Sequence, residues 1–171
     1  RGHIRLAQLF LEHGADPNIM DELDTTPLRA AVARRARCFA ALLLEKGADV
    51  NAQHCSIAIP ALHQAVWNDD RKLVELLLLS GAKTNLVYGN CRSALHDAAS
   101  KARLEIVRLL VKHGANVHAA DREGETVLHA ARGRPEVVAF LKSAGARIDA
   151  AGHRKEVPSA NPVAKAGGQG R

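Results

Sequence analysis

The strongest constraint on this chain is an internal repeat with a period of about 33 residues, a length typical of stacked supersecondary units. Gly-Ala pairs recur at nearly even intervals and begin at Gly14, Gly47, Gly81, Gly114 and Gly145. A second marker keeps the same phase, since four leucines recur at the same interval: Leu28, Leu62, Leu95 and Leu128. Two markers with one period indicate stacked copies of a single unit, each burying its apolar face against the next.

One copy is enough to predict the elements of the unit. Residues 93–100 read SALHDAAS, where Ser93 can cap a short helix whose leucine and alanines share one face. Residues 104–114 read LEIVRLLVKHG, with apolar residues at helical spacing up to Gly114, which can adopt the left-handed conformation that ends a helix. The polar, turn-rich residues 115–125 predict a loop or hairpin that reaches the next copy.

The second marker is typical of a known family. The sequences TPLRAAV, PALHQAV, SALHDAA and TVLHAAR, which begin at residues 26, 60, 93 and 126, resemble the Thr-Pro-Leu-His-x-Ala motif of ankyrin repeats. The chain is similar to that family over roughly residues 1–150. The resemblance implies an all-α repeat solenoid of about four and a half repeats, each a helix-turn-helix followed by a β-hairpin or loop.

The two markers also predict the boundaries. We expect a partial repeat with a second helix only at 1–18 and a disordered basic tail at 150–171. Between them we expect four complete units: unit one at 19–51, unit two at 52–85, unit three at 86–118 and unit four at 119–149. Unit four is expected to be the C-terminal cap. Leu6, Leu9 and Phe10 are then expected to lack part of their cover, and the parent protein to continue upstream with more repeats. Asp24 and Cys91 stand where unit four has Gly124, so positive φ is expected at both.

Charge and cysteine usage narrow the class of protein. The net charge is +6, but half of the excess lies in the segment 151–171, which has four basic side chains and one acidic side chain. The nearly balanced remainder argues against nucleic-acid binding. Three cysteines without a C-x-x-C pair predict a reducing, intracellular location, cytoplasmic or nuclear. No run of about 18 apolar residues occurs, so no membrane span is expected.

The residues that suggest chemistry have a structural interpretation. The resemblance implies that His63, His96 and His129 hydrogen-bond loop backbone between units. His54-Cys55 has no second pair at metal-ligand spacing, so neither a metal site nor a cofactor is expected. Asp69-Asp70 falls at a turn between two helices, where an acid caps the next helix. With no catalytic triad order, phosphate-binding loop or H-E-x-x-H motif, the sequence predicts no enzyme.

The resemblance implies that partners lie against the hairpin tips and the inner, first-helix face. The predicted partner-binding residues are Arg34, Trp67, Asn68, Tyr88, Asn90, Arg92, Lys101, Arg122 and Arg132; Glu22, Leu23, Cys55, Ile57 and Glu125 also fall on the hairpins. Trp67 is either an interface hot spot or packing against the following hairpin. The basic side chains of the inner face either favour an acidic partner or are ordinary solvated charges.

These features predict a non-catalytic, monomeric protein–protein interaction scaffold that binds a protein or peptide. The alternative is a regulatory or targeting segment of a larger enzyme, channel or ubiquitin-ligase adaptor, although the tail lacks the apolar pattern of a ligase-docking helix. The resemblance also implies possible sites for an asparaginyl hydroxylase at Asn51 and Asn85, each of which has a leucine, Leu43 or Leu77, at the corresponding place in the preceding helix.

Overall fold

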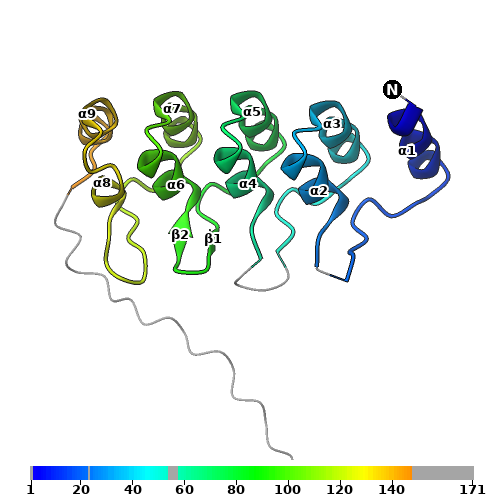
Figure 1. Ribbon diagram of the computed structural model, residues 1–171, viewed down its shortest axis with the longest axis horizontal. Helices are drawn as coiled ribbons and strands as arrows, with labels where there is room; N and C mark the ends of the chain where they lie inside the picture. The colour runs from blue at the N-terminus through cyan, green and yellow to red at the C-terminus, as the bar shows by residue number, and fades with distance from the viewer. Residues whose placement is uncertain (1, 23, 54–57, 148–171) are drawn as a thin grey trace, which may run out of the picture.

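The computed structural model describes residues 2–22, 24–53 and 58–147. Helix pairs stand side by side in a row, with the hairpins projecting from one side of it (Figure 1). The first helices of the units, α2, α4, α6 and α8, contact one another in sequence, and the second helices form a parallel layer above them. The helices are α1 (Gly2–Glu12), α2 (Pro27–Ala33), α3 (Arg37–Glu45), α4 (Ala61–Trp67), α5 (Arg71–Leu79), α6 (Ala94–Ser100), α7 (Leu104–Lys112), α8 (Val127–Ala130) and α9 (Pro135–Ser143). The predicted all-α repeat solenoid is confirmed.

The hairpin of unit three carries the sheet found in the described part of the chain. Strands β1 (Val87–Tyr88) and β2 (Arg92–Ser93) pair antiparallel, with Val87 opposite Ser93 and Tyr88 opposite Arg92. In unit four a single bridge between Ala120 and Thr126 takes the corresponding place. These loops therefore project as hairpins, as their turn-rich sequence predicts.

The core consists of the recurring leucines and small residues. Leu28, Leu62, Leu95 and Leu128 are all buried, and so are Ala65, Ala98 and Ala99 on the first helices. Because alanine has the smallest side chain that still removes apolar surface from water, neighbouring helices approach closely. The second helices add leucine, isoleucine and valine to the same cluster.

The first helices begin with a repeated hydrogen-bond pattern from which unit two departs. Nδ1 of His96 lies 2.8 Å from the Ser93 hydroxyl, and Nδ1 of His129 lies 2.9 Å from the Thr126 hydroxyl. Pro60 fills this position in unit two and offers neither a hydroxyl nor an N–H. Nδ1 of His63 is consequently buried without a hydrogen-bond partner among the described residues.

The helix ends and turns use left-handed backbone. At Gly114, with φ of 84°, the chain turns so that the Ala115 amide donates to the Leu110 carbonyl over 3.0 Å. The predicted positive φ at Asp24 and Cys91 is confirmed, with values of 54° and 60°. The turns between first and second helices also contain one such residue each: Arg35, Asp69, Ala102 and Gly133.

The asparagine that ends each of the first three Gly-Ala motifs joins one unit to the next. The Asn51 amide donates to the Gly81 carbonyl over 3.1 Å, and its oxygen accepts from the Lys83 amide over 2.8 Å. Asn85 makes the same two bonds to unit three, and Asn18 makes them to unit one. These joints explain why a pentapeptide without catalytic residues recurs along the chain.

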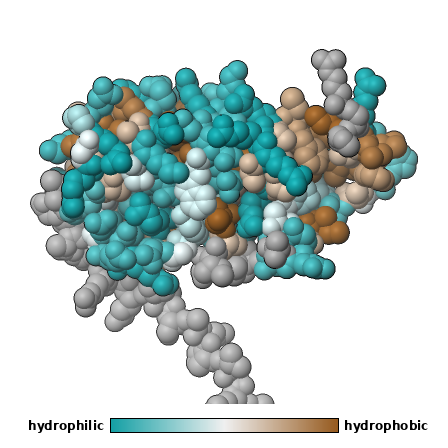
Figure 2. Space-filling view, viewed as in Figure 1, coloured by the Kyte–Doolittle hydropathy of each residue, from teal (hydrophilic) through white to brown (hydrophobic). Residues whose placement is uncertain are grey.

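The first end of the solenoid is apolar and partly uncovered. Leu6 and Phe10 of α1 are 51% and 58% exposed, whereas Ile106 and Leu110, in the same positions of α7, are 2% and 0% exposed. Figure 2 shows apolar residues gathered at the α1 end of an otherwise mostly hydrophilic face. The expectation that Leu6, Leu9 and Phe10 lack cover is confirmed, because no first helix packs on α1 in the described chain.

Several expectations fall outside the described residues. These are the disordered tail at 150–171, the His54-Cys55 pair, and the hairpin positions Leu23, Cys55 and Ile57. Within the described part of the chain, no helix combines the length and apolarity needed to cross a membrane.

Candidate functional site

A buried carboxylate organises the inner face at the boundary between units two and three. Asp97, on α6, has a side chain only 8% exposed. Its Oδ2 accepts a hydrogen bond of 2.9 Å from Nε1 of Trp67 and one of 3.5 Å from the Tyr88 hydroxyl. Its Oδ1 lies 3.4 Å from Nε of Arg92. Three donors, one of which is a cation, offset the cost of removing this carboxylate from water.

Two aromatic rings and an imidazole pack edge to face beside this carboxylate. The Tyr88 ring meets the His63 ring at a centroid distance of 4.9 Å and the Trp67 ring at 5.3 Å, with interplanar angles of 80° and 77°. Such edge-to-face contacts favour a fixed arrangement of the rings. We call His63, Trp67, Tyr88, Arg92 and Asp97 the aromatic–acid cluster.

Burial perturbs two groups of this cluster. It raises the pKa of the Tyr88 hydroxyl to about 12, and the nearby Asp97 charge acts in the same direction. Burial also lowers the pKa of His63 to about 4, against the opposing influence of Asp97. At neutral pH the imidazole is therefore uncharged, and its Nε2 lies 3.2 Å from the Arg92 carbonyl, to which it donates. The cluster holds uncharged rings in place and offers no group poised for proton transfer.

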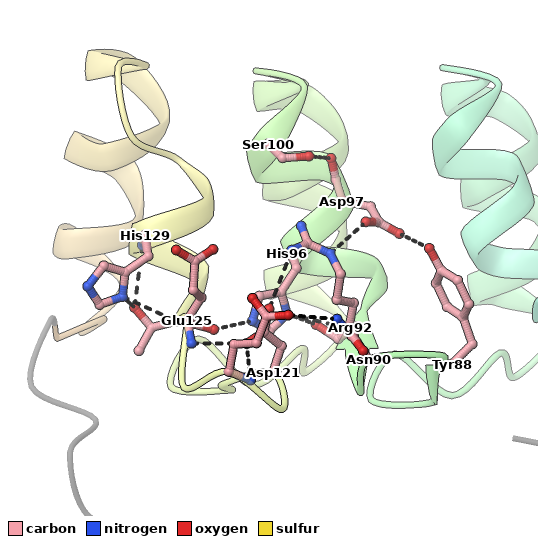
Figure 3. A network of polar contacts seen from close by, with 12 residues as sticks. Tyr88, Asn90, Arg92, His96, Asp97, Ser100, Asp121, Glu125 and His129 are labelled. Atoms are coloured by element: carbon pink, nitrogen blue, oxygen red, sulfur yellow. Dashed lines mark hydrogen bonds and ion pairs between the residues drawn. The ribbon is translucent and has the colours of Figure 1, made fainter. Parts of the chain in front are cut away.

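A second buried carboxylate shapes the next hairpin. Oδ1 of Asp121 accepts from the backbone amides of Glu123 and Glu125, both over 3.0 Å, and its Oδ2 lies 3.5 Å from Arg92. Figure 3 shows Arg92 between the two carboxylates, reaching from the unit-three hairpin toward both. Arg92 thereby couples the cluster to the hairpin of unit four.

The hairpins of units three and four are also joined through Asn90. The Asn90 carbonyl accepts from the Arg122 amide over 2.9 Å, and its side-chain amide donates to Glu123 over 3.0 Å. The Arg122 side chain is exposed beside this contact. On the helix side of this contact, Nε2 of His96 lies 3.2 Å from the Glu125 carbonyl. The inter-unit role implied for His63 and His96 is thus confirmed.

The turns between first and second helices form another line of inter-unit contacts. Nε of Arg37 donates to both oxygens of Asp70 over 2.9 and 2.8 Å, and Arg103 pairs with Asp69 over 2.6 Å. Asp70 also accepts from the Leu73 amide over 3.1 Å, which confirms that it caps α5. Burial raises the pKa of Asp70, but the hydrogen bonds from Arg37 and Leu73 outweigh it and lower that pKa overall.

The predicted partner-binding residues separate into two groups in the structure. Trp67, Asn68, Tyr88 and Arg92 are half-buried and engaged within the protein, whereas Arg34, Asn90, Lys101, Arg122 and Arg132 are exposed. Trp67 contacts the hairpin residue Tyr88 edge to face and stays half-buried. Asn68 donates to the Val32 carbonyl over 2.7 Å and so closes the end of α2.

Asp97 and Asp121 organise the site, and the sequence interpretation missed both. For Asp97 the available signal was an acid inside SALHDAAS, where an otherwise small and apolar helix face carries a charge. Charged residues are seldom buried unless they are paired. Among the described residues, no group of three His, Cys, Asp or Glu side chains is placed to hold a metal ion.

The comparisons with known proteins agree with this architecture. A family model described as ankyrin repeats (3 copies) matches residues 62–151, and one described as ankyrin repeat matches residues 24–55. A putative ankyrin repeat protein of fowlpox virus is 32% identical over 128 residues, which cover 73% of this chain and 38% of the relative. The mouse B-cell lymphoma 3 protein homolog is 36% identical over 122 residues, or 71% of this chain and 27% of the relative.

A further relative matches over a shorter stretch. Mouse protein phosphatase 1 regulatory subunit 27 is 45% identical over 69 residues, which cover 39% of this chain and 45% of that protein. The chain thus spans less than half the length of each of these curated relatives.

Proposed function

The chain belongs to the ankyrin repeat family, and we propose that it is a non-catalytic scaffold that binds a partner protein or peptide on its hairpin tips and inner helix face. Ankyrin repeats in general mediate protein–protein interaction. The rigid stack offers a preformed surface, so binding orders few residues and costs little conformational entropy.

The observation that carries this proposal is the aromatic–acid cluster with its exposed rim. The cluster fixes Trp67 and Tyr88 by contacts within the protein, and Asn90 and Arg122 project beside them on joined hairpins. Aromatic residues and arginine supply much of the binding energy in interfaces, and exposed polar residues form their rim. Asp97 and Asp121 are saturated by donors, which leaves them structural rather than catalytic.

A second candidate function rests on the relatives. One of them is a regulatory subunit by name, and the transient receptor potential channel pyrexia of Drosophila melanogaster is 38% identical over 131 residues, only 14% of that protein. These names favour a regulatory segment within a larger enzyme or channel. A targeting segment or a ubiquitin-ligase adaptor is the remaining form of this alternative. The same surface would then bind another part of the assembly. The proposed scaffold is a monomer, and its proposed location is intracellular, either cytoplasmic or nuclear.

Hydroxylation of Asn51 and Asn85 is a separate proposal. Both amides are half-buried or exposed, and both bridge two units through the bonds described above. Mass analysis of the two tryptic peptides from native source should show an added oxygen. Peptides without it contradict the proposal.

Capture of partners tests the proposed function. The immobilised full chain is compared with an Asn90→Ala/Arg122→Ala variant and with a Lys46→Ala/Lys112→Ala control, whose changes lie at the C-terminal ends of the second helices α3 and α7. A protein retained by the chain and the control, but lost from the hairpin variant, supports the proposal. Equal retention by all three, or no retained protein, contradicts it.

A further inference from the structure

The charges of the solenoid are separated between its two edges. The turns between first and second helices, residues 34–37, 68–72, 101–103 and 132–134, hold nine basic and two acidic residues. We call these residues the turn edge. Its net charge is +7, and it is still +5 with Glu105 and Glu136 of the adjoining helix turns included.

The opposite edge is acidic. The hairpin residues 20–25, 88–92 and 121–125 hold six acidic and two basic residues, a net charge of −4. Figure 3 shows the two edges at units three and four, since Ser100, next to the turn edge, lies at the end of α6 remote from Asp121 in the next hairpin. A charged partner would therefore be oriented by the two edges.

The two acids of the turn edge are already neutralised. Asp70 pairs with Arg37 and Asp69 with Arg103, each across a unit boundary. The remaining exposed cations have no ion pair within the described residues: Arg34, Arg35, Arg71, Lys72, Lys101 and Arg132. The edge thus presents a row of exposed cations, and its own two carboxylates are already paired.

The inter-unit ion pairs join the turns of units one, two and three. Arg34, Lys101 and Arg132 each come directly before the left-handed residue of their turn, so they occupy one repeating position. Packed helices lie roughly 10 Å apart. A chain in the polyproline II conformation has three residues per turn and advances about 3.1 Å per residue. One unit of the solenoid therefore corresponds to about one turn of such a peptide, so that every third side chain points to the same face.

From this match we propose that the turn edge binds an acidic segment of a partner protein in the polyproline II conformation, with carboxylates at every third residue. The proposal rests on the proposed protein-binding function and names the partner's chemistry. Each carboxylate would face the cations of one turn. Asn68 occupies the repeating position in unit two, where Arg71 and Lys72 supply the charge instead.

Fluorescence anisotropy with designed peptides tests the proposal directly. The probe is a labelled 12-residue Gly/Ser peptide with glutamate at every third position, and its control has the same composition with the glutamates adjacent. The chain should bind the spaced peptide more tightly. An Arg34→Gln/Lys101→Gln/Arg132→Gln variant should lose about tenfold in affinity, because each exposed ion pair contributes modestly.

A charge-matched variant distinguishes binding at the turn edge from general electrostatic attraction to the positively charged protein. Lys46→Gln/Lys112→Gln/Lys142→Gln removes the same charge from the second helices and should leave the affinity within twofold. Equal losses in both variants, or equal binding of both peptides, overturn the proposal. Tighter binding of a single-stranded oligonucleotide or an anionic vesicle at the same edge also overturns it. A partner captured through the hairpins but insensitive to the turn-edge variant would contradict this inference alone.

Discussion

Nε1 of Trp67 donates a hydrogen bond of 2.9 Å to Oδ2 of Asp97, and the two residues belong to adjacent repeats. The bond links the end of α4 to the middle of α6, beside the ring of Tyr88. It connects the packing of the solenoid with the shape of its inner face, because the same carboxylate positions Arg92 and Tyr88.

Replacing Asp97 should therefore destabilise the fold strongly. In Asp97→Ala the indole N–H and the Arg92 guanidinium lose a buried partner, and we expect a loss of about 3 kcal/mol in the free energy of unfolding. Denaturant unfolding followed by the fluorescence of Trp67, the only tryptophan, measures it. Glu105→Ala, on the exposed side of α7, should change stability by less than about 0.5 kcal/mol. Equal effects of the two substitutions would show that Asp97 has no organising role.

Restoring the missing helix cap in unit two should stabilise the protein. Pro60→Ser supplies a hydroxyl and an N–H to Nδ1 of His63, as Ser93 does for His96. Pairing a buried acceptor contributes about 1–3 kcal/mol, and losing the stiffness of proline costs about 0.4–1 kcal/mol. We expect a net gain of about 1 kcal/mol in chemical denaturation. Pro60→Ala, which restores only the N–H, should gain less, and a Ser variant no better than Ala would contradict the capping argument.

The repeat period was sufficient to predict the solenoid and its helices, because these features follow from local sequence. The roles of Asp97 and Asp121 could not be predicted in the same way. They depend on which side chains of neighbouring units meet, and Trp67 is distant from Asp97 in sequence. The pairing of Arg37 with Asp70 likewise depends on the stacking of two turns.

Truncating the same repeat position should cost much more unfolding free energy in the middle of the solenoid than at its end. Leu110 is fully buried in α7, whereas Phe10 in α1 is more than half exposed. Leu110→Ala should cost about 3 kcal/mol, as truncations in a packed core do. Phe10→Ala should cost less than about 1 kcal/mol in this chain, since it removes little buried area. Similar losses of stability for the two variants in thermal or denaturant unfolding would contradict the claim that Phe10 is only partly covered.

Acid should destabilise the protein through His63. Its pKa is about 4 in the folded chain and about 6.5 when exposed. The unfolded chain therefore binds the proton more tightly, and stability falls as the pH drops from about 6.5 to about 4. For this one group the loss reaches about 2 kcal/mol by pH 5. His63→Gln should flatten that part of the profile measured by denaturant titration, and an unchanged slope would exclude His63 as its source.

The most direct test of the protein-binding surface is amide hydrogen exchange of the full chain, alone and with a partner captured by it. The account predicts slower exchange in the hairpin residues 88–92 and 121–125 and in the first helices α4 and α6 when the partner is bound. Protection confined to the second helices α5 and α7, with unchanged hairpins and first helices, would contradict it.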